Sequence, residues 1–279
     1  MQDNIAILVV FFNKLEETTR CIESFLPLGV AIHVLNNGSK ITEWTALTTK
    51  FASATQCRFY HFDENKGPAQ GRNYLIQQAK EDWLFLVDND ITIQPGEDWT
   101  DRVKEALAAD SEADVILPRL WNVHEASFAG HPRFQLMGNR LSLNYDQQVR
   151  ANYFPSGAAI IKRNVFSRFG LFDDGLFAFE DYEYAVRLLK KGESLHIQET
   201  AAITLVHDHR FQKKRIDKMA VRERYNEERL EKSFALVAQK HAIVFDHDWQ
   251  WWSRKQVREM TGTTIFKRLK DKFKQLTTR

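Results

Sequence analysis

The sequence predicts an α/β fold: a mostly parallel, Rossmann-like sheet flanked by helices, with a small antiparallel portion and a C-terminal helical extension. Three observations support this prediction. Short apolar runs alternate with amphipathic stretches through the first 120 residues, as in a doubly wound parallel sheet. Between residues 120 and 162, glycines and prolines interrupt short apolar pieces. Basic and aromatic residues are concentrated after residue 245.

The parallel part is expected to contain five strands, each rich in aliphatic or aromatic residues. They are Ile5–Phe12, Ala31–Leu35, Arg58–Phe62, Trp83–Val87 and Val115–Leu117. Amphipathic stretches separate the first four strands and are expected to form helices. Because ligands bind beyond the carboxyl ends of strands in such sheets, the residues that follow each run are the first candidates for a site.

The second half is expected to begin with loops and antiparallel strands over residues 120–162. A helix should then start near Glu180, since apolar residues recur at helical spacing, acids crowd the first turn, and Gly192 follows two lysines at the end. A strand over Ile203–Val206 and a charged helix over about 213–241 complete the pattern.

The 279 residues are expected to form one domain over residues 1–245 and a separate extension over 246–279. The two cysteines, Cys21 and Cys57, lack the spacing of a zinc site, which also argues against a disulfide framework and fits a reducing compartment. The sequence begins without a signal-peptide pattern, and it has no apolar run of the ~18 residues that span a bilayer. We therefore expect a cytoplasmic protein, soluble or peripherally bound to a membrane.

Two carboxylates stand where a predicted buried strand ends, in the triplet Asp88-Asn89-Asp90. Unpaired buried carboxylates are costly, and a divalent cation is a common solution. Such a cation could bridge diphosphate oxygens and neutralise the charge of a leaving nucleoside diphosphate. The same triplet, read alone, also suits two solvated turn residues. A further alternative is a haloacid-dehalogenase-like phosphatase that uses Asp88 and Asp90, although its motif normally follows the first strand.

Four segments in order resemble the motifs of family 2 glycosyltransferases, which have the GT-A fold. The segments are Ile5–Asn13, Asn36–Ser39, Asn65–Asn73 and Asp88–Asp90. The resemblance extends over most of residues 5–210. It implies a metal-dependent enzyme that moves a sugar from a nucleoside-diphosphate sugar to a hydroxyl acceptor with inversion. The residues that the resemblance places at the donor are Phe11, Asn13, Asn36, Gly38, Arg72, Asp88 and Asn89.

The resemblance also assigns roles in the second half. Glu180 and Asp181 are similar to the family's Glu-Asp pair, which implies that Asp181 is the base for the acceptor hydroxyl and Glu180 its neighbour that orients a substrate. Their place at a helix N-terminus is expected to lower the pKa of both carboxyls. His207 resembles the third metal ligand beside Asp88 and Asp90, for Mn²⁺ or Mg²⁺.

Two further features concern the donor. Gly157, in a run of small residues, is expected to let the backbone approach the donor sugar closely. Asn36 stands where the family has an aspartate that reads uracil, and an amide both accepts and donates hydrogen bonds. A UDP-sugar is therefore the preferred expectation. A non-catalytic sugar-nucleotide or glycan-binding module on the same fold is the remaining alternative.

The extension has its own character. Phe266, Leu269, Phe273 and Leu276 form a helical stripe among lysines and arginines, and from Arg254 onward nine basic residues face two acids, for a net charge of +7. One interpretation is an in-plane helix on an anionic membrane, near a lipid-linked or other saccharide acceptor. The alternative is a helix packed on the main domain. The rest of the chain carries −5, which argues against nucleic-acid binding.

Overall fold

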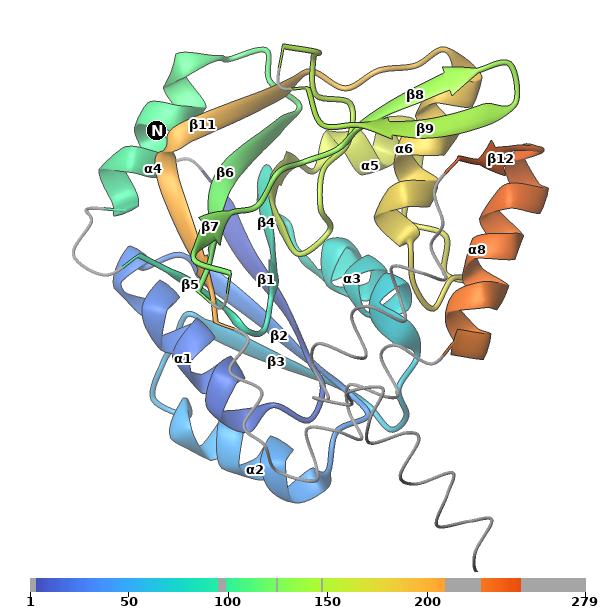
Figure 1. Ribbon diagram of the computed structural model, residues 1–279. Helices are drawn as coiled ribbons and strands as arrows, with labels where there is room; N and C mark the ends of the chain where they lie inside the picture. Colours follow the sequence, from blue (N-terminus) through green and yellow to red (C-terminus); the bar gives the residue numbers. More distant parts are fainter. Residues whose placement is uncertain (1–3, 95–98, 124, 147, 209–226, 247–279) are drawn as a thin grey trace, which may run out of the picture.

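The computed structural model describes residues 4–94, 99–123, 125–146, 148–208 and 227–246. Within these residues a nine-stranded sheet runs through the molecule (Figure 1). Its strands are β1 (Ile5–Phe11), β2 (Ala31–Asn37), β3 (Cys57–Phe62), β4 (Trp83–Asp88), β5 (Ile91–Ile93), β6 (Val115–Asn122), β7 (Ser127–Phe128), β10 (Ala158–Lys162) and β11 (Ile197–His207). The strand order is β3-β2-β1-β4-β10-β6-β11-β5, with β7 paired to β6.

The first four strands of this order are parallel, and β6 and β11 are parallel to each other. Between them, β10 runs antiparallel to both β4 and β6. The predicted doubly wound sheet is therefore confirmed for the first half of the chain. The antiparallel strands expected over residues 120–162 are also confirmed, since β7, β10 and the hairpin of β8 (Arg133–Met137) and β9 (Arg140–Asn144) are all antiparallel to neighbours.

Helices cover both faces of the sheet (Figure 1). They are α1 (Leu15–Phe25), the short η1 (Leu26–Leu28), α2 (Ile41–Lys50), α3 (Gly67–Gln78), α4 (Trp99–Ala109), α5 (Asn164–Phe169), α6 (Glu180–Lys191) and α8 (Glu227–His241). Alternation along β1 divides the core: Ile7 and Val9 pack with α1, α2 and α4, while Ala6 and Leu8 pack with α3, α5 and α6.

A third apolar cluster joins α6 and α8 to a small second sheet. This sheet has the order β12-β9-β8, where β12 is Val244–Phe245. Phe134 and Leu141 of the hairpin, Val186 of α6 and Val237 of α8 meet in this cluster. Since α6 carries the Glu180-Asp181 pair at its first turn, the small sheet and α8 support the helix on which this pair stands.

Some elements have other bounds in the structure than the sequence predicted. The strand expected at Ile203–Val206 begins at Ile197 and contains an irregularity between Thr200 and Thr204. The charged helix expected over about 213–241 is described only from Glu227, because residues 209–226 lie outside the described part. The extension over 247–279 lies outside it too, so its separation from the main domain stays a prediction. No helix in the described ranges is both long and apolar enough to cross a membrane.

Candidate active site

The triplet lies at the carboxyl end of β4, where a parallel sheet places its ligands. The Asp88 carboxylate accepts a hydrogen bond from the Arg72 guanidinium at 2.6 Å. The backbone amide of Asp88 donates to the Gly157 carbonyl at 2.8 Å. Asn89 points elsewhere, since its amide donates to the Thr18 hydroxyl on α1 at 2.9 Å. Asp88 is thus fixed by its side chain to α3 and by its backbone to Gly157, the residue directly before β10.

Gly157 is required by the Asp88 carboxylate itself. A Cβ atom built at Gly157 would overlap the carboxyl carbon and both carboxyl oxygens of Asp88. The sequence predicted a close approach between this glycine and a donor sugar. The close approach in the structure is to Asp88, so Gly157 acts on the site by leaving room for this side chain.

Asp90 is enclosed by two nitrogen groups. Its Oδ2 accepts from the Lys14 ammonium at 2.7 Å, and its Oδ1 lies 3.4 Å from Nε2 of His207. Asn122 fixes the histidine: its amide nitrogen donates to Glu125, so its Oδ1 faces Nδ1 of His207 at 3.1 Å and accepts from it. Nε2, the other ring nitrogen, faces Asp90.

This geometry tests the predicted metal site. A carboxylate oxygen of Asp90 and Nε2 of His207, 3.4 Å apart, are ligand types that Mn²⁺- or Mg²⁺-class ions accept, and the Asn122 contact is the kind of support that metal-binding histidines have. The third predicted ligand, Asp88, contacts Arg72 instead. Among the described residues no group of three His, Cys, Asp or Glu side chains is arranged to hold a metal. The structure therefore brings Asp90 and His207 together and leaves Asp88 apart.

Arg72 joins the triplet to the acid pair. One guanidinium nitrogen contacts Asp88, and the other donates to Glu180 at 2.5 Å. The Ser156 hydroxyl donates to the same Glu180 oxygen at 2.9 Å. Both Arg72 and Glu180 are buried. Residues 72, 88 and 180 lie far apart in the chain, and this single side chain gathers them into one site.

Asp181 has a different environment. Its Oδ2 accepts from the Tyr153 hydroxyl at 2.7 Å and from the Ser156 amide at 3.3 Å, while Oδ1 accepts from its own neighbour's amide, Tyr182 N, at 2.9 Å. Burial, followed by the adjacent Glu180 charge, raises the pKa of Asp181 to about 6. The expectation that this pKa is lowered is wrong, because burial and the Glu180 charge outweigh the hydrogen bonds from Tyr153 and Ser156 and the charge of Arg72.

The remaining donor-site predictions fall on the turn after β2. Asn36 is fully buried: its Oδ1 accepts from the Ser39 amide and its Nδ2 contacts Nδ1 of His61, both at 2.8 Å. Gly38 has a left-handed φ of +75° and packs directly on the backbone of residues 64 and 65. These contacts tie the turn to β3 and to the loop before α3.

The turn after β1 is fastened to the same place. Asn13 accepts from the Lys40 amide through its side chain, and its own amide donates to the Ser39 hydroxyl at 3.0 Å. The Phe11 ring lies in the core and stacks on Trp44. Phe11 and Asn13 thus shape this turn, and their contact with a donor stays a prediction.

The comparison with known proteins adds the family. The family model described as glycosyl transferase family 2 matches residues 6–170, more than half of the chain. The chain belongs to glycosyl transferase family 2. An uncharacterized protein of Haemophilus influenzae is 22% identical to this family member over 171 residues, which are 60% of this chain and 91% of the relative.

Solved structures similar to this family 2 chain share its GT-A fold. Residues 1–349 of S. aureus TarS in complex with UDP-GlcNAc superpose with a TM-score of 0.57 at 16% identity, over 80% of this chain and 66% of that one. The mannosyltransferase PcManGT from Pyrobaculum calidifontis, in complex with GDP-Man and Mn²⁺, gives 0.57 at 14% identity, over 86% and 65%. The chain thus spans about two thirds of each structure's length, and the likeness concerns the fold.

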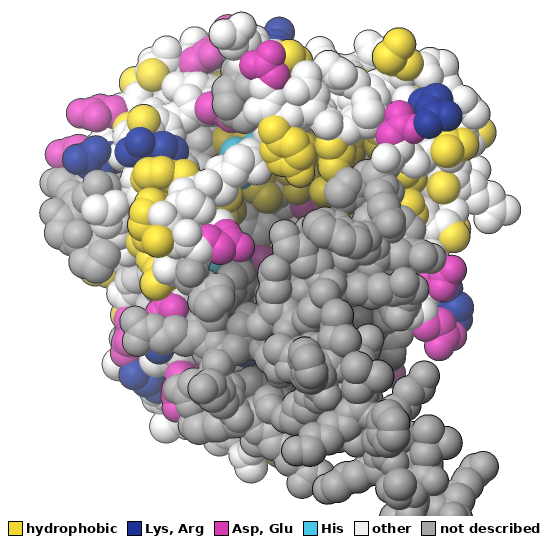
Figure 2. All heavy atoms as spheres, in the orientation of Figure 1, with side chains coloured by type: hydrophobic (Ala, Val, Ile, Leu, Met, Phe, Trp, Pro, Cys, Tyr) yellow, Lys and Arg dark blue, Asp and Glu magenta, His cyan; other side chains and the backbone are white. Residues whose placement is uncertain are grey.

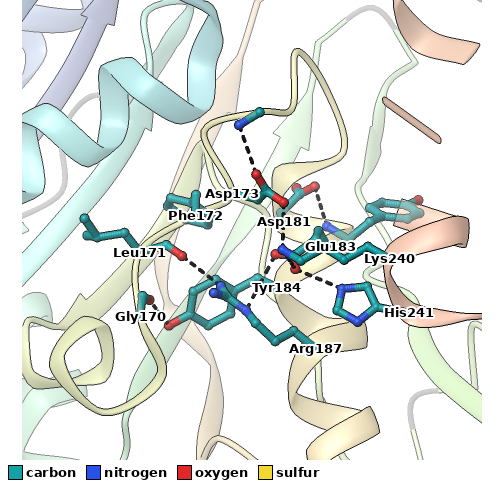
Figure 3. Close-up of polar contacts among 12 residues, drawn as sticks. Gly170, Leu171, Phe172, Asp173, Asp181, Glu183, Tyr184, Arg187, Lys240 and His241 are labelled. Atoms are coloured by element: carbon teal, nitrogen blue, oxygen red, sulfur yellow. Dashed lines mark hydrogen bonds and ion pairs between the residues drawn. The ribbon is translucent and has the colours of Figure 1, made fainter. Parts of the chain in front are cut away.

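Helix α6 of this family 2 chain is linked to α8 by a cluster of charged side chains around the buried Glu183 (Figure 3). Glu183, fully buried, contacts Lys240 at 3.0 Å and His241 at 2.9 Å, both on α8. Lys240 also binds Asp173, at 2.7 Å, in the loop that leads to α6. Arg187 lies 3.6 Å from the second Glu183 oxygen. These contacts fix the helix that carries Asp181.

Four residues of the site were not singled out from the sequence: Lys14, Asn122, Tyr153 and Ser156. Lys14 directly follows Asn13 at the end of the first predicted strand, so its position could have marked it as a site candidate. Ser156 lies in the small-residue run that contains Gly157. Tyr153 and Asn122 have no local pattern that marks them, since their partners Asp181 and His207 are 28 and 85 residues away.

Proposed function

We propose that this family 2 member transfers a sugar from a nucleoside-diphosphate sugar to a hydroxyl acceptor with inversion at the anomeric carbon. The observation that carries the proposal is the Arg72 bridge between Asp88 and Glu180. Through this contact the triplet, proposed for the diphosphate, lies next to the first turn of α6, where Asp181 is proposed for the acceptor. An in-line displacement needs both groups around one anomeric carbon, with the leaving group on one side of it and the nucleophile on the other.

Asp181 is the proposed base. The acceptor oxygen forms a bond to the anomeric carbon, its proton passes to the Asp181 carboxylate, and the bond between that carbon and the diphosphate oxygen breaks. The nucleoside diphosphate leaves with the electron pair. A base is most effective when its pKa lies near the working pH. With a pKa of about 6, Asp181 is mostly ionised at pH 7 yet more basic than an exposed aspartate.

Arg72 and Glu180 are proposed to position the donor. Arg72 is buried and directs its guanidinium to the space between the triplet and α6, where it can also bind diphosphate oxygens. Glu180 accepts from Arg72 and Ser156 through the same oxygen, so its carboxylate is fixed as a hydrogen-bond acceptor for a sugar hydroxyl. Both roles rest on these contacts.

A divalent cation, Mn²⁺ or Mg²⁺, is proposed at Asp90 and His207. Asp90 and His207 would hold the ion, as protein side chains and substrate phosphates commonly share Mg²⁺-class ions. Such an ion would stabilise negative charge on the leaving diphosphate. Asp88 remains a predicted third ligand; it contacts Arg72, and Lys14 lies on the other side of Asp90.

The substrates are proposed by class. The similar structures hold a UDP-sugar in one case and GDP-Man in the other, and Asn36, with both amide groups engaged by Ser39 and His61, is compatible with either base class. A UDP-sugar stays the preferred donor. We propose a surface glycan or a lipid-linked saccharide as the acceptor, and a cytoplasmic location with the C-terminal extension on the inner face of an anionic membrane.

The phosphatase alternative finds no support in this arrangement, because the triplet follows the fourth strand of a chain that matches family 2 over residues 6–170. A non-catalytic binding module is the rival that an experiment must exclude. Binding alone does not require a carboxyl whose pKa is raised, as that of Asp181 is, whereas a catalytic base does.

The experiment has two stages. Thermal shift against UDP-, GDP-, dTDP- and ADP-sugars, each with and without Mn²⁺, identifies the donor. Release of nucleoside diphosphate is then measured for the wild type and for Asp181→Asn, and the anomeric configuration of the product is read by ¹H NMR. We expect turnover only in the wild type and an inverted product. Donor binding without turnover in the wild type supports the binding module; a retained configuration refutes inversion.

A further inference from the structure

The two oxygens of Asp181 have unequal hydrogen-bond partners. An ionised carboxylate offers about two acceptor positions on each oxygen. Oδ2 receives two donors, the Tyr153 hydroxyl and the Ser156 amide. Within the described part of the chain Oδ1 receives one, the Tyr182 amide. With respect to these residues, one acceptor position of Oδ1 is left for a further donor, while those of Oδ2 are used.

We propose that Tyr153 is a positioning residue for the base: with the Ser156 amide it saturates Oδ2 of Asp181, fixes the carboxylate plane, and assigns proton uptake from the acceptor hydroxyl to Oδ1. This inference rests on the proposed function and adds to it the reacting atom and the residue that selects it. Tyr153 itself touches neither the reacting carbon nor the proton that moves.

The position of Tyr153 separates its hydroxyl from its ring. The ring packs on Phe134 at 5.2 Å and on Tyr182 at 5.5 Å between centroids, inside the cluster that joins α6 to the β8–β9 hairpin. The hydroxyl reaches out of this cluster to Asp181. A phenylalanine at this position keeps the ring contacts and removes one hydrogen bond, so its effect reports on the hydroxyl.

The groups around Asp181 determine the direction of the effect. Burial and Glu180, on its own helix, raise the pKa of Asp181, whereas the Tyr153 hydroxyl, the Ser156 amide and the Arg72 charge on α3 lower it. Tyr182 also lies beside it, with its amide on Oδ1. Of these groups only the Tyr153 contribution is lost in Tyr153→Phe. The pKa of Asp181 should therefore rise in that variant, since a donor to the charged form is removed.

The test compares Tyr153→Phe with Tyr184→Phe. Tyr184 is a buried residue of α6 that packs among aromatic rings. Its hydroxyl donates a hydrogen bond to the Gly170 carbonyl at 3.0 Å, away from Asp181 (Figure 3). The two variants thus lose the same atom from the same kind of surroundings. The rate of sugar transfer is measured from pH 5 to 9 with the donor identified above, and kcat and KM are separated.

For the wild type we expect an acidic limb near pH 6, the pKa of Asp181. Tyr153→Phe should move this limb to higher pH and lower kcat on the plateau about tenfold, as expected for a lost hydrogen bond to a charged group, with donor KM unchanged. Tyr184→Phe should leave the limb where it is. Equal limbs in Tyr153→Phe and the wild type overturn the positioning role.

A second measurement requires no turnover. In protein labelled with ¹³C at aspartate carboxyls, the resonance missing from Asp181→Asn reports the titration of Asp181. We expect its midpoint to rise in Tyr153→Phe and to stay constant in Tyr184→Phe; a constant midpoint in both overturns the inference. If Asp181→Asn retains full transfer, the proposed function fails, whatever Tyr153→Phe shows by NMR, so the two failures are distinguishable.

Discussion

The triplet contains two aspartates and the acid pair one, and the fold gives these carboxylates different partners. Asp88 and Asp90 contact the cations Arg72 and Lys14. Asp181 contacts a phenol and two backbone amides. Only the first solution brings a cation into direct contact with the carboxylates. This difference is the reason that we propose the triplet for the diphosphate and its metal ion, and Asp181 for the proton of the acceptor.

In Figure 2 hydrophobic side chains gather along one edge of a hollow in which acidic side chains are visible. The contrast between a charged and a neutral environment within this region leads to four predictions, from the largest effect to the smallest.

Asp181→Asn should reduce transfer by about 10² to 10⁴, the usual contribution of a general base. The donor should still bind, because the triplet and Arg72 are untouched. Isothermal titration with the donor and an assay of nucleoside diphosphate release check the two halves of this statement. Loss of donor binding in this variant would assign Asp181 to the donor and remove the contrast between the two carboxylate groups.

Arg72→Met should destabilise the fold by about 3 kcal/mol, since it leaves Asp88 and the buried Glu180 without their shared cation. Urea denaturation at pH 7 measures the free energy of unfolding. Arg72→Met combined with Glu180→Gln should recover part of the loss, as one uncompensated charge is removed. Arg58→Met, at a half-exposed arginine beside Glu81, is the control and should cost about 1 kcal/mol or less.

The same denaturation experiment, run against pH, examines Asp181. Its folded pKa of about 6 lies above the ~3.9 of an unfolded aspartate, so between these values the folded state binds more protons and its stability falls as pH rises. Asp181→Asn should remove this slope and be more stable than the wild type by about 1–3 kcal/mol at pH 7.5. Identical slopes in both proteins would contradict the raised pKa.

Gly157→Ala should cost about 1–3 kcal/mol and weaken metal and donor binding, because its Cβ forces the Asp88 carboxylate to move. Gly130→Ala is a matched control: the contact of a Cβ there with the described residues is to Tyr145 at 3.7 Å, an ordinary van der Waals distance. Mn²⁺ and donor titrations should be normal for the control. Normal binding by Gly157→Ala as well would show that the position of Asp88 does not matter to the site.

The sequence by itself determined the local features of this protein. Hydrophobic alternation predicted β1 to β4, and acids, lysines and Gly192 predicted both ends of α6. The resemblance to family 2 predicted that Asp88, Asp90, Arg72 and the Glu180-Asp181 pair belong to one site, and their roles there stay predictions. The predictions of strands and helices succeed because propensity and periodicity act over a few neighbouring residues.

The tertiary structure decided which of these residues touch. β10 runs antiparallel between β4 and β6, and this pairing brings Gly157 against Asp88 and Ser156 against Glu180. The pKa of Asp181 illustrates the physical reason. The local helix dipole predicts a lowered pKa for Asp181, but burial in the packed fold raises it. Burial is a property of the packed fold, and no local pattern contains it.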